Sequence, residues 1–224
     1  MVPFIDFHTH QPHRSGVFSI RNASPHDSLL FSDSSPEFIS VGLHPWLIPQ
    51  DYNLDALYGQ LYYFAGYSNV IAIGETGMDK AITTAMQMQL DVLEVHIRVS
   101  EALGKPIIVH CVRSYQELLA LRVWHKCKQP WIFHGFNGSA QLAMQLLKAH
   151  CLVSFGKAIM QGNTRAAHSI SQLEFGQFFL ETDNSGENIE DIYGMCASIK
   201  KVEVDAVKEH IFALLKKTIP NLDL

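Results

Sequence analysis

Eight short, almost continuously apolar segments recur along this chain and constrain its fold more than any other feature. They are rich in Ile, Val and Phe, as strands buried on both faces of a sheet are. Helical patterns separate several of them, and strands that alternate with helices form a parallel sheet. The eight segments therefore predict an α/β fold, a (β/α)8 TIM-type barrel. The segments are residues 2–8, 16–22, 37–44, 69–75, 105–110, 130–136, 151–157 and 176–183, and the helical patterns lie at 85–104, 114–126, 139–150, 189–201 and 204–218.

The first part of the chain departs from a regular barrel. Only residues 11–16 separate the first two segments, which is too short for a crossover helix. Residues 23–36 are rich in Ser, Asp and Pro and predict a loop or a single turn. We therefore expect a trimmed barrel with its first one or two outer helices missing or reduced. No linker or repeat divides the chain, which predicts a single domain over residues 1–224.

Composition excludes several classes of protein. The net charge of −5 argues against binding of nucleic acid through a broad basic surface. The four cysteines are scattered without a CxxC motif, which predicts reduced thiols in a cytoplasmic protein. The N-terminus lacks the pattern of a signal peptide, and no apolar run approaches the length of a membrane span. We expect no membrane partner, and the oligomeric state is left open.

Histidines and carboxylates stand at the C-terminal ends of most predicted strands. In a parallel barrel these ends share one rim, where the active sites of this fold lie. We therefore expect the side chains to gather there despite their separation in sequence. The five histidines within or at the ends of predicted helices (His96, His125, His150, His168 and His210) are expected to be solvent-exposed. The rim residues are His8, His10, His44, Glu75, His110, His134, Glu181 and Asp183.

The rim residues suit a centre of two divalent cations. His8 and His10 project to one face of their strand, and two imidazoles on one face suit a metal ion. Four histidines (His8, His10, His110 and His134), Glu75 and Asp183 are the candidate ligands. Six ligands are too many for one tetrahedral ion, so we expect two ions bridged by a carboxylate, with Glu75 as the bridge. We assign the first ion to His8, His10, Glu75 and Asp183, and the second to Glu75, His110 and His134. Asp183 is also the candidate general base, and the ions are Zn, Mg, Mn or Co.

At this point the motifs resemble the TatD family of metal-dependent hydrolases. The matching stretches, in order, are IDFHTH, VGLHP, IGETGMD, KPIIVH, FHGFNG and LETD. The resemblance implies a two-metal hydrolase of phosphodiester bonds in DNA, a deoxyribonuclease or 3′-to-5′ exonuclease. It implies metal roles for His8, His10, Glu75, His110, His134 and Asp183, and a place near the substrate phosphate for His44.

The chain also departs from the family pattern. Arg113 stands three residues after His110, whereas the family arginine stands two after, and Arg113 is the candidate phosphate contact. Lys80 replaces a common aromatic residue, and residues 184–191 form a shortened loop. His13 and His26 lie in early loops without an assigned role. Three alternatives stay open: an amidohydrolase-like enzyme acting on a small-metabolite ester, lactone or amide, a PHP-type phosphoesterase, and a metal-binding protein without catalysis.

Overall fold

The computed structural model describes residues 2–161, 164–220 and 222. Each of the eight predicted strands is present, and the sheet follows the chain order from first to last. The strand pairs with a described register are parallel. The prediction of a (β/α)8 TIM-type topology is therefore confirmed. The strands are β1 (Phe4–Thr9), β2 (Val17–Ala23), β3 (Phe38–Val41), β4 (Val70–Asp79), β5 (Ile107–Val112), β6 (Trp131–Phe133), β7 (Cys151–Phe155) and β8 (Phe178–Leu180).

Seven α-helices and three short 3-10 helices occur among the described residues. Among the α-helices, α1 and α5 were not predicted, because α1 is rich in tyrosine and contains Gly59, and α5 is short and polar. The 3-10 helices η2 and η3 were not predicted either. The side chain of Asn53 caps the N-terminus of α1 by accepting from the Ala56 amide, and that of Thr164 caps α5 by accepting from the Ala167 amide. The helices are α1 (Leu54–Phe64), α2 (Met86–Leu103), α3 (Tyr115–Trp124), α4 (Ala140–Lys148), α5 (Arg165–Gln172), α6 (Ile189–Lys200), α7 (Val204–Thr218), η1 (Ser28–Leu30), η2 (Pro45–Leu47) and η3 (Lys157–Ile159).

The early outer helices are reduced, as predicted. Residues 10–16, all of them described, contain no helix between β1 and β2. Between β2 and β3 the helical structure amounts to the three residues of η1. The short connection and the Ser- and Pro-rich segment leave no room for a regular crossover helix. Among the described helices, none has the length and apolarity that a bilayer crossing needs.

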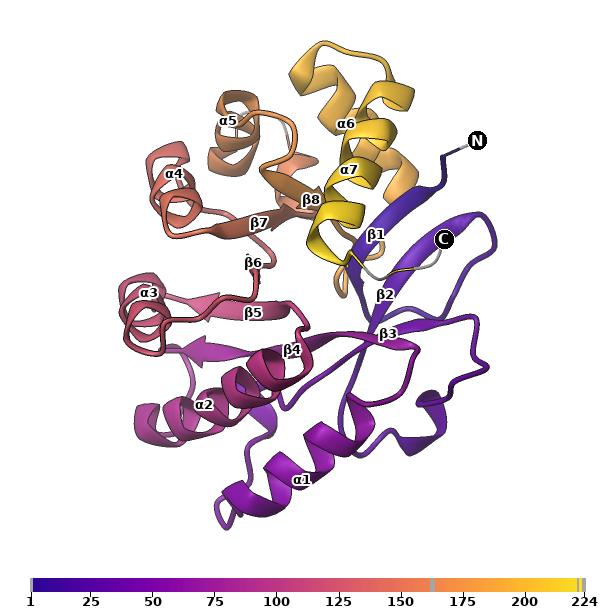
Figure 1. Ribbon diagram of the computed structural model, residues 1–224. Coiled ribbons are helices and arrows are strands. Elements are labelled where there is room, and N and C mark those ends of the chain that lie inside the picture. The colour runs from indigo at the N-terminus through magenta and orange to yellow at the C-terminus, as the bar shows by residue number, and fades with distance from the viewer. Residues whose placement is uncertain (1, 162–163, 221, 223–224) are drawn as a thin grey trace. The chain divides into compact units, whose positions relative to one another are not determined.

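The chain divides into two compact units, Asn22–Trp131 and Met1–Arg21 with Ile132–Leu224. In the unit Asn22–Trp131, β4 lies between β3 and β5, and all ten of its residues are buried. Helix α2 packs against β4, and α1 runs beside α2 (Figure 1). Helix α2 ends at Gly104, which takes the left-handed conformation that favours glycine at a helix C-terminus (φ 69°).

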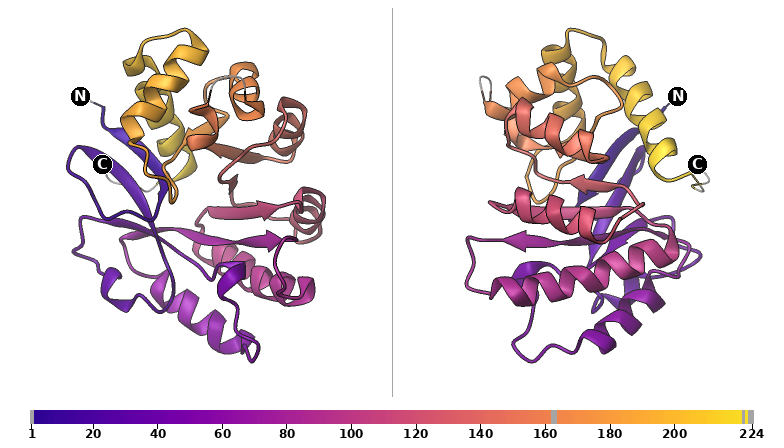
Figure 2. Two further views of the ribbon diagram at one scale, coloured as in Figure 1. Left: turned by 180° about the vertical axis from the view of Figure 1, so that it is seen from behind. Right: turned by 60° about the vertical axis from the view of Figure 1, so that its left-hand side comes forward.

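In the unit Met1–Arg21 with Ile132–Leu224, the last strand lies beside the first. The Asp183 amide donates to the His8 carbonyl at 2.9 Å, and the His10 amide donates to the Asp183 carbonyl at 3.2 Å. Helices α6 and α7 pack together over β1 (Figure 2). The buried hydroxyl of Tyr193 on α6 accepts from the Ile5 amide and donates to the Ile5 carbonyl, which fixes α6 to β1. The single-domain prediction for residues 1–224 stays a prediction, and residues 1, 162–163, 221 and 223–224 lie outside the described residues.

Candidate metal centre

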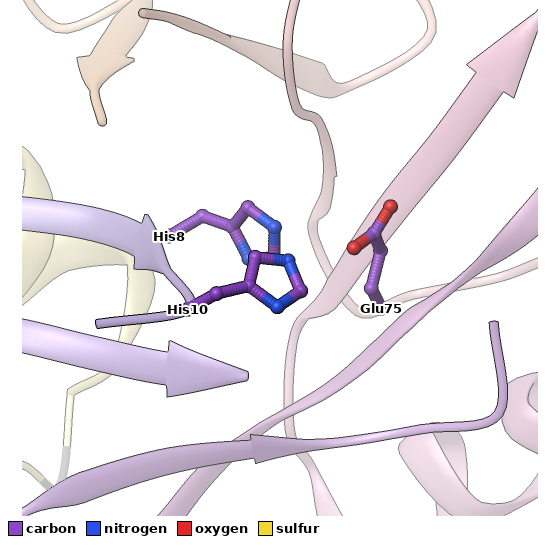
Figure 3. A group of neighbouring side chains, drawn as sticks. All are labelled: His8, His10 and Glu75. Atoms are coloured by element: carbon purple, nitrogen blue, oxygen red, sulfur yellow. The ribbon is translucent and has the colours of Figure 1, made fainter. Parts of the chain in front are cut away.

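Two histidines and an aspartate meet where β1 ends beside β8. The side chain of His8 is fully buried, whereas that of His10 is 38% exposed. Nε2 of each histidine lies 3.6 Å from the same oxygen, Oδ1 of Asp183. Figure 3 shows the two imidazoles at the end of β1, and their ring centroids are 5.3 Å apart. The main-chain bonds between residues 8–10 and Asp183 therefore bring the two imidazoles to one carboxylate.

His134, which follows β6, joins this group. Its ring centroid lies 4.5 Å from that of His8. Ligand atoms of His8, His134 and Asp183 all lie within 4.8 Å of one another. Glu181 is fully buried behind them, and its Oε1 accepts a hydrogen bond of 2.5 Å from the Gly135 amide and lies 3.7 Å from Nδ1 of His134. We interpret Glu181 as a residue that orients His134, because a carboxylate beside the second ring nitrogen fixes the orientation of a ligating imidazole.

Asp6 has a structural role in the same unit. Its two carboxylate oxygens accept from the backbone amide and the hydroxyl of Thr182, at 2.8 and 2.7 Å. Burial raises the pKa of Asp6 to about 6, although both hydrogen bonds act in the opposite direction. Asp6 therefore holds the segment that contains Asp183 against β1.

In the other unit, Glu75 on β4 is approached by two histidines. Its side chain, drawn on its strand in Figure 3, is 3% exposed. Oε1 of Glu75 lies 2.8 Å from Nδ1 of His110 and 3.1 Å from Nε2 of His44. The Glu75 amide donates to the side chain of Asn22 at 2.7 Å, which fixes the backbone at this point. Ligand atoms of His44, Glu75 and His110 all lie within 4.8 Å of one another, so this group also fits a divalent cation.

Asp79, at the end of β4, orients His110 from its other side. One carboxylate oxygen of Asp79 accepts from the Trp46 indole at 2.8 Å and lies 3.3 Å from Nε2 of His110. Burial acts to raise the pKa of Asp79, but the hydrogen bonds from Trp46, the Ala81 amide and His110 outweigh it and hold the pKa below its ordinary value. Gln89 on α2 accepts from the Asp79 amide at 2.7 Å and donates to its carbonyl, which fixes the end of the strand.

His96 is fully buried, which overturns the prediction that it is solvent-exposed. Its Nε2 accepts from the Leu43 amide at 2.9 Å, and its Nδ1 donates to the Val92 carbonyl at 2.7 Å. Burial lowers the pKa of His96 to about 4, so the ring is neutral. The position on the inner face of α2 was visible in the helical pattern, but its partner, 53 residues away in sequence, was not. His96 thus fixes the residue that precedes His44.

Three further residues from the sequence analysis lie outside both groups. Arg113 is exposed at the end of β5, with a left-handed backbone (φ 55°). His26 is exposed in the loop after β2. His13 lines a cavity of about 460 Å³ beside β1 and β2, together with Arg14, which forms an ion pair with Glu190. None of the groups of three ligands found among the described residues includes these side chains.

Comparison with known proteins decides the family. The family described as TatD related DNase matches residues 24–219 of the chain. The chain belongs to this family. A protein of Buchnera aphidicola named an uncharacterized metal-dependent hydrolase is 29% identical over 164 residues, which are 69% of this chain and 61% of that relative. The Escherichia coli metal-dependent hydrolase YjjV is 25% identical over 158 residues, covering 69% and 60%. The chain thus spans about 60% of the length of these two TatD relatives.

Solved structures agree with the assignment of the TatD fold. The crystal structure of the TatD homologue YjjV from Escherichia coli superposes with a TM-score of 0.84 at 18% identity, covering 98% of both chains. A TatD-family hydrolase from Entamoeba histolytica gives a TM-score of 0.76 at 15% identity, covering 97% of this chain and 98% of the other. At these identities the similarity shows the TIM-type fold of a TatD protein, which confirms the fold prediction.

Within this TatD-family chain, His134 and His44 have other neighbours than the sequence interpretation gave them. His134 lies with His8 and Asp183, whereas the sequence interpretation placed it with Glu75 and His110. His44 lies against Glu75, whereas it was expected near the substrate phosphate. Imidazole nitrogens and carboxylate oxygens at these distances fit divalent cations such as Zn, Mn or Co. The assignment of individual residues to two ions stays a prediction.

Proposed function

We propose that this chain hydrolyses phosphodiester bonds in DNA, as a two-metal deoxyribonuclease that removes nucleotides in the 3′-to-5′ direction. The observation that supports it most is the presence of two ligand groups, His8, His134 and Asp183 in one unit and His44, Glu75 and His110 in the other. Membership of the family described as TatD related DNase supports the same reaction class. A cytoplasmic location suits such an enzyme.

The chain's own residues have distinct tasks in this proposal. His8, His10, His110 and His134 would hold two divalent ions through imidazole nitrogens, and Glu75 would supply the carboxylate ligand that the two ions share. When bound, the ions stabilise negative charge on the phosphoryl oxygens and lower the pKa of a water molecule. Asp183 orients the attacking water and takes its proton at a carboxylate oxygen. Glu181 and Asp79 hold His134 and His110 in the orientation that binding needs.

The substrate is proposed to be short and single-stranded. The chain has 17 basic and 22 acidic residues, so few cations are available to contact the phosphates of a long duplex. Arg113, exposed at the end of β5, is the proposed phosphate contact. Lys80, the residue after β4, is already engaged in an ion pair with Glu117. A 3′ end or a short strand requires fewer such contacts than a duplex does.

The test is an activity panel on the metal-loaded protein and on Asp183→Asn. Purified protein is supplied with Mg, Mn, Zn or Co and assayed on single-stranded DNA, RNA, bis(p-nitrophenyl) phosphate and a lactone. We expect cleavage of DNA that falls by a factor of about 10²–10⁴ in Asp183→Asn, the range for loss of a general base. His168→Gln, an exposed histidine of α5, is the matched control and retains activity.

Other outcomes distinguish the alternatives. Turnover of the lactone alone would favour an amidohydrolase-like enzyme acting on small metabolites. Cleavage of small phosphate esters without DNA would favour a phosphoesterase of the PHP type. A protein that binds metal and cleaves nothing would be a metal-binding protein without catalysis. Each of these results would contradict the proposed nuclease.

A further inference from the structure

Trp46 is an exposed aromatic residue beside one of the two ligand groups. It belongs to η2 and follows His44 by two positions. Its side chain is 64% exposed, and the next residue, Leu47, is 60% exposed. By contrast, Trp131 in the same unit is fully buried. Trp46 therefore presents an aromatic surface to solvent beside the candidate ligands His44 and His110.

The indole of Trp46 is held in one orientation. Its Nε1 donates to Asp79 at 2.8 Å, and its backbone amide donates to Nδ1 of His44 at 3.1 Å. Asp79 is itself fixed, because its other oxygen accepts from the Ala81 amide at 2.8 Å and its backbone is bound by Gln89. An aromatic ring that is anchored at its edge and exposed elsewhere loses little conformational entropy when a ligand packs against it.

The ring also stands at a defined place relative to the ligand group. Its centroid lies 5.2 Å from that of His44 with the planes at 89°, and 6.2 Å from that of His110 at 76°. A planar group that packs on the exposed indole therefore lies within a few ångströms of the residues around Glu75. Stacking on an aromatic side chain is how proteins bind single-stranded nucleic acid with few phosphate contacts.

The geometry points to Trp46 as a base-stacking residue, which binds a nucleobase next to the scissile phosphodiester of a single-stranded substrate. This inference rests on the proposed nuclease function and adds a contact with the base to the proposed phosphate contact of Arg113. Every nucleobase has a flat aromatic face. The contact therefore strengthens binding of a nucleotide that bears a base and does not distinguish one base from another. Trp46 is in this role a specificity-determining residue.

The test compares two oligonucleotides that differ in the bases alone. One is a short single-stranded thymidine oligomer, and the other has tetrahydrofuran abasic residues at its last two 3′ positions. For the metal-loaded protein we expect kcat/KM to be about 30-fold higher on the first, the middle of the range for one stacked base. Trp46→Ala should remove this preference, mainly through KM, so that the two oligomers are cleaved with about the same kcat/KM. Trp46→Phe, which keeps a ring, should restore part of the preference.

Controls separate stacking from a disturbance of Asp79. Loss of the indole hydrogen bond would impair both substrates equally through His110, whereas loss of stacking lowers the rate on the base-bearing oligomer. Trp124→Ala removes a tryptophan that is 80% exposed at the end of α3 and should change neither rate. If Trp46→Ala retains the wild-type ratio of the two rates, or lowers both rates in proportion, the stacking role is wrong although the nuclease function stands.

A binding measurement keeps the two proposals distinguishable if no DNA is cleaved. In the Trp124→Phe background, titration with the thymidine oligomer should quench the fluorescence of Trp46, and the abasic oligomer should quench it less. Quenching without cleavage would contradict the nuclease and leave the stacking site. Equal quenching by the two oligomers, or none, would refute the stacking site.

Discussion

The buried ring of His96 makes the stability of this protein depend on pH in a predictable way. The ring is neutral because it is fully buried, and because Nε2 accepts from the Leu43 amide and therefore bears no proton. Burial lowers its pKa to about 4, against 6.5 for an unperturbed histidine. Below pH 6.5 the His96 ring becomes protonated in the unfolded chain, whereas in the folded protein it stays neutral down to about pH 4. Stability is therefore full above pH 6.5 and is lost as the pH falls toward 4.

The size of the loss follows from the two pKa values. The difference between these pKa values corresponds to about 3 kcal/mol over the whole range. Between pH 7 and pH 5 the linkage relation assigns about 2 kcal/mol of lost unfolding free energy to this one ring. That is a large fraction of the total stability of a typical domain.

Urea unfolding at pH 7 and pH 5, with EDTA present so that metal binding does not contribute, measures the loss. His96→Gln retains an acceptor for the Leu43 amide and cannot titrate. The decrease in unfolding free energy between the two pH values should therefore be smaller in His96→Gln than in wild type by about 2 kcal/mol. His168→Gln, at an exposed position, should keep the wild-type decrease. If His96→Gln loses as much stability as wild type does, the buried neutral ring is not the cause.

Two further predictions concern the residues around Glu75. Glu75→Gln should leave the fold intact and lower the bound metal, measured by elemental analysis, because an amide is a weaker ligand than a carboxylate; two ions at full occupancy would remove Glu75 from the bridging role. Gly77→Ala should destabilise the protein by about 3 kcal/mol or more in urea unfolding, because a Cβ at φ 153° would lie 1.9 Å from the carbonyl oxygen of His110; a variant of wild-type stability would contradict this close approach of β4 and β5.

The sequence by itself determined the fold class and where along the strands the site residues stand. Short apolar segments that alternate with helical patterns define a parallel sheet, and every one of the eight segments is a strand. His8, His110 and Asp183 stand near strand C-terminal ends, as local pattern and chain order predict. Glu75 was expected to end its strand but lies within β4, which continues to Asp79. The loss of the first helices was likewise readable, since six residues cannot form a crossover.

The tertiary structure alone decided which side chain meets which. His134 lies with His8 rather than with His110, His96 binds the Leu43 amide instead of water, and Trp46 is anchored by Asp79. The sequence pattern places a residue on a face of its own element, whereas a hydrogen bond joins atoms of two elements that are distant in the chain. Side-chain partners, and the pKa values that depend on them, follow from packing, and periodicity does not encode packing.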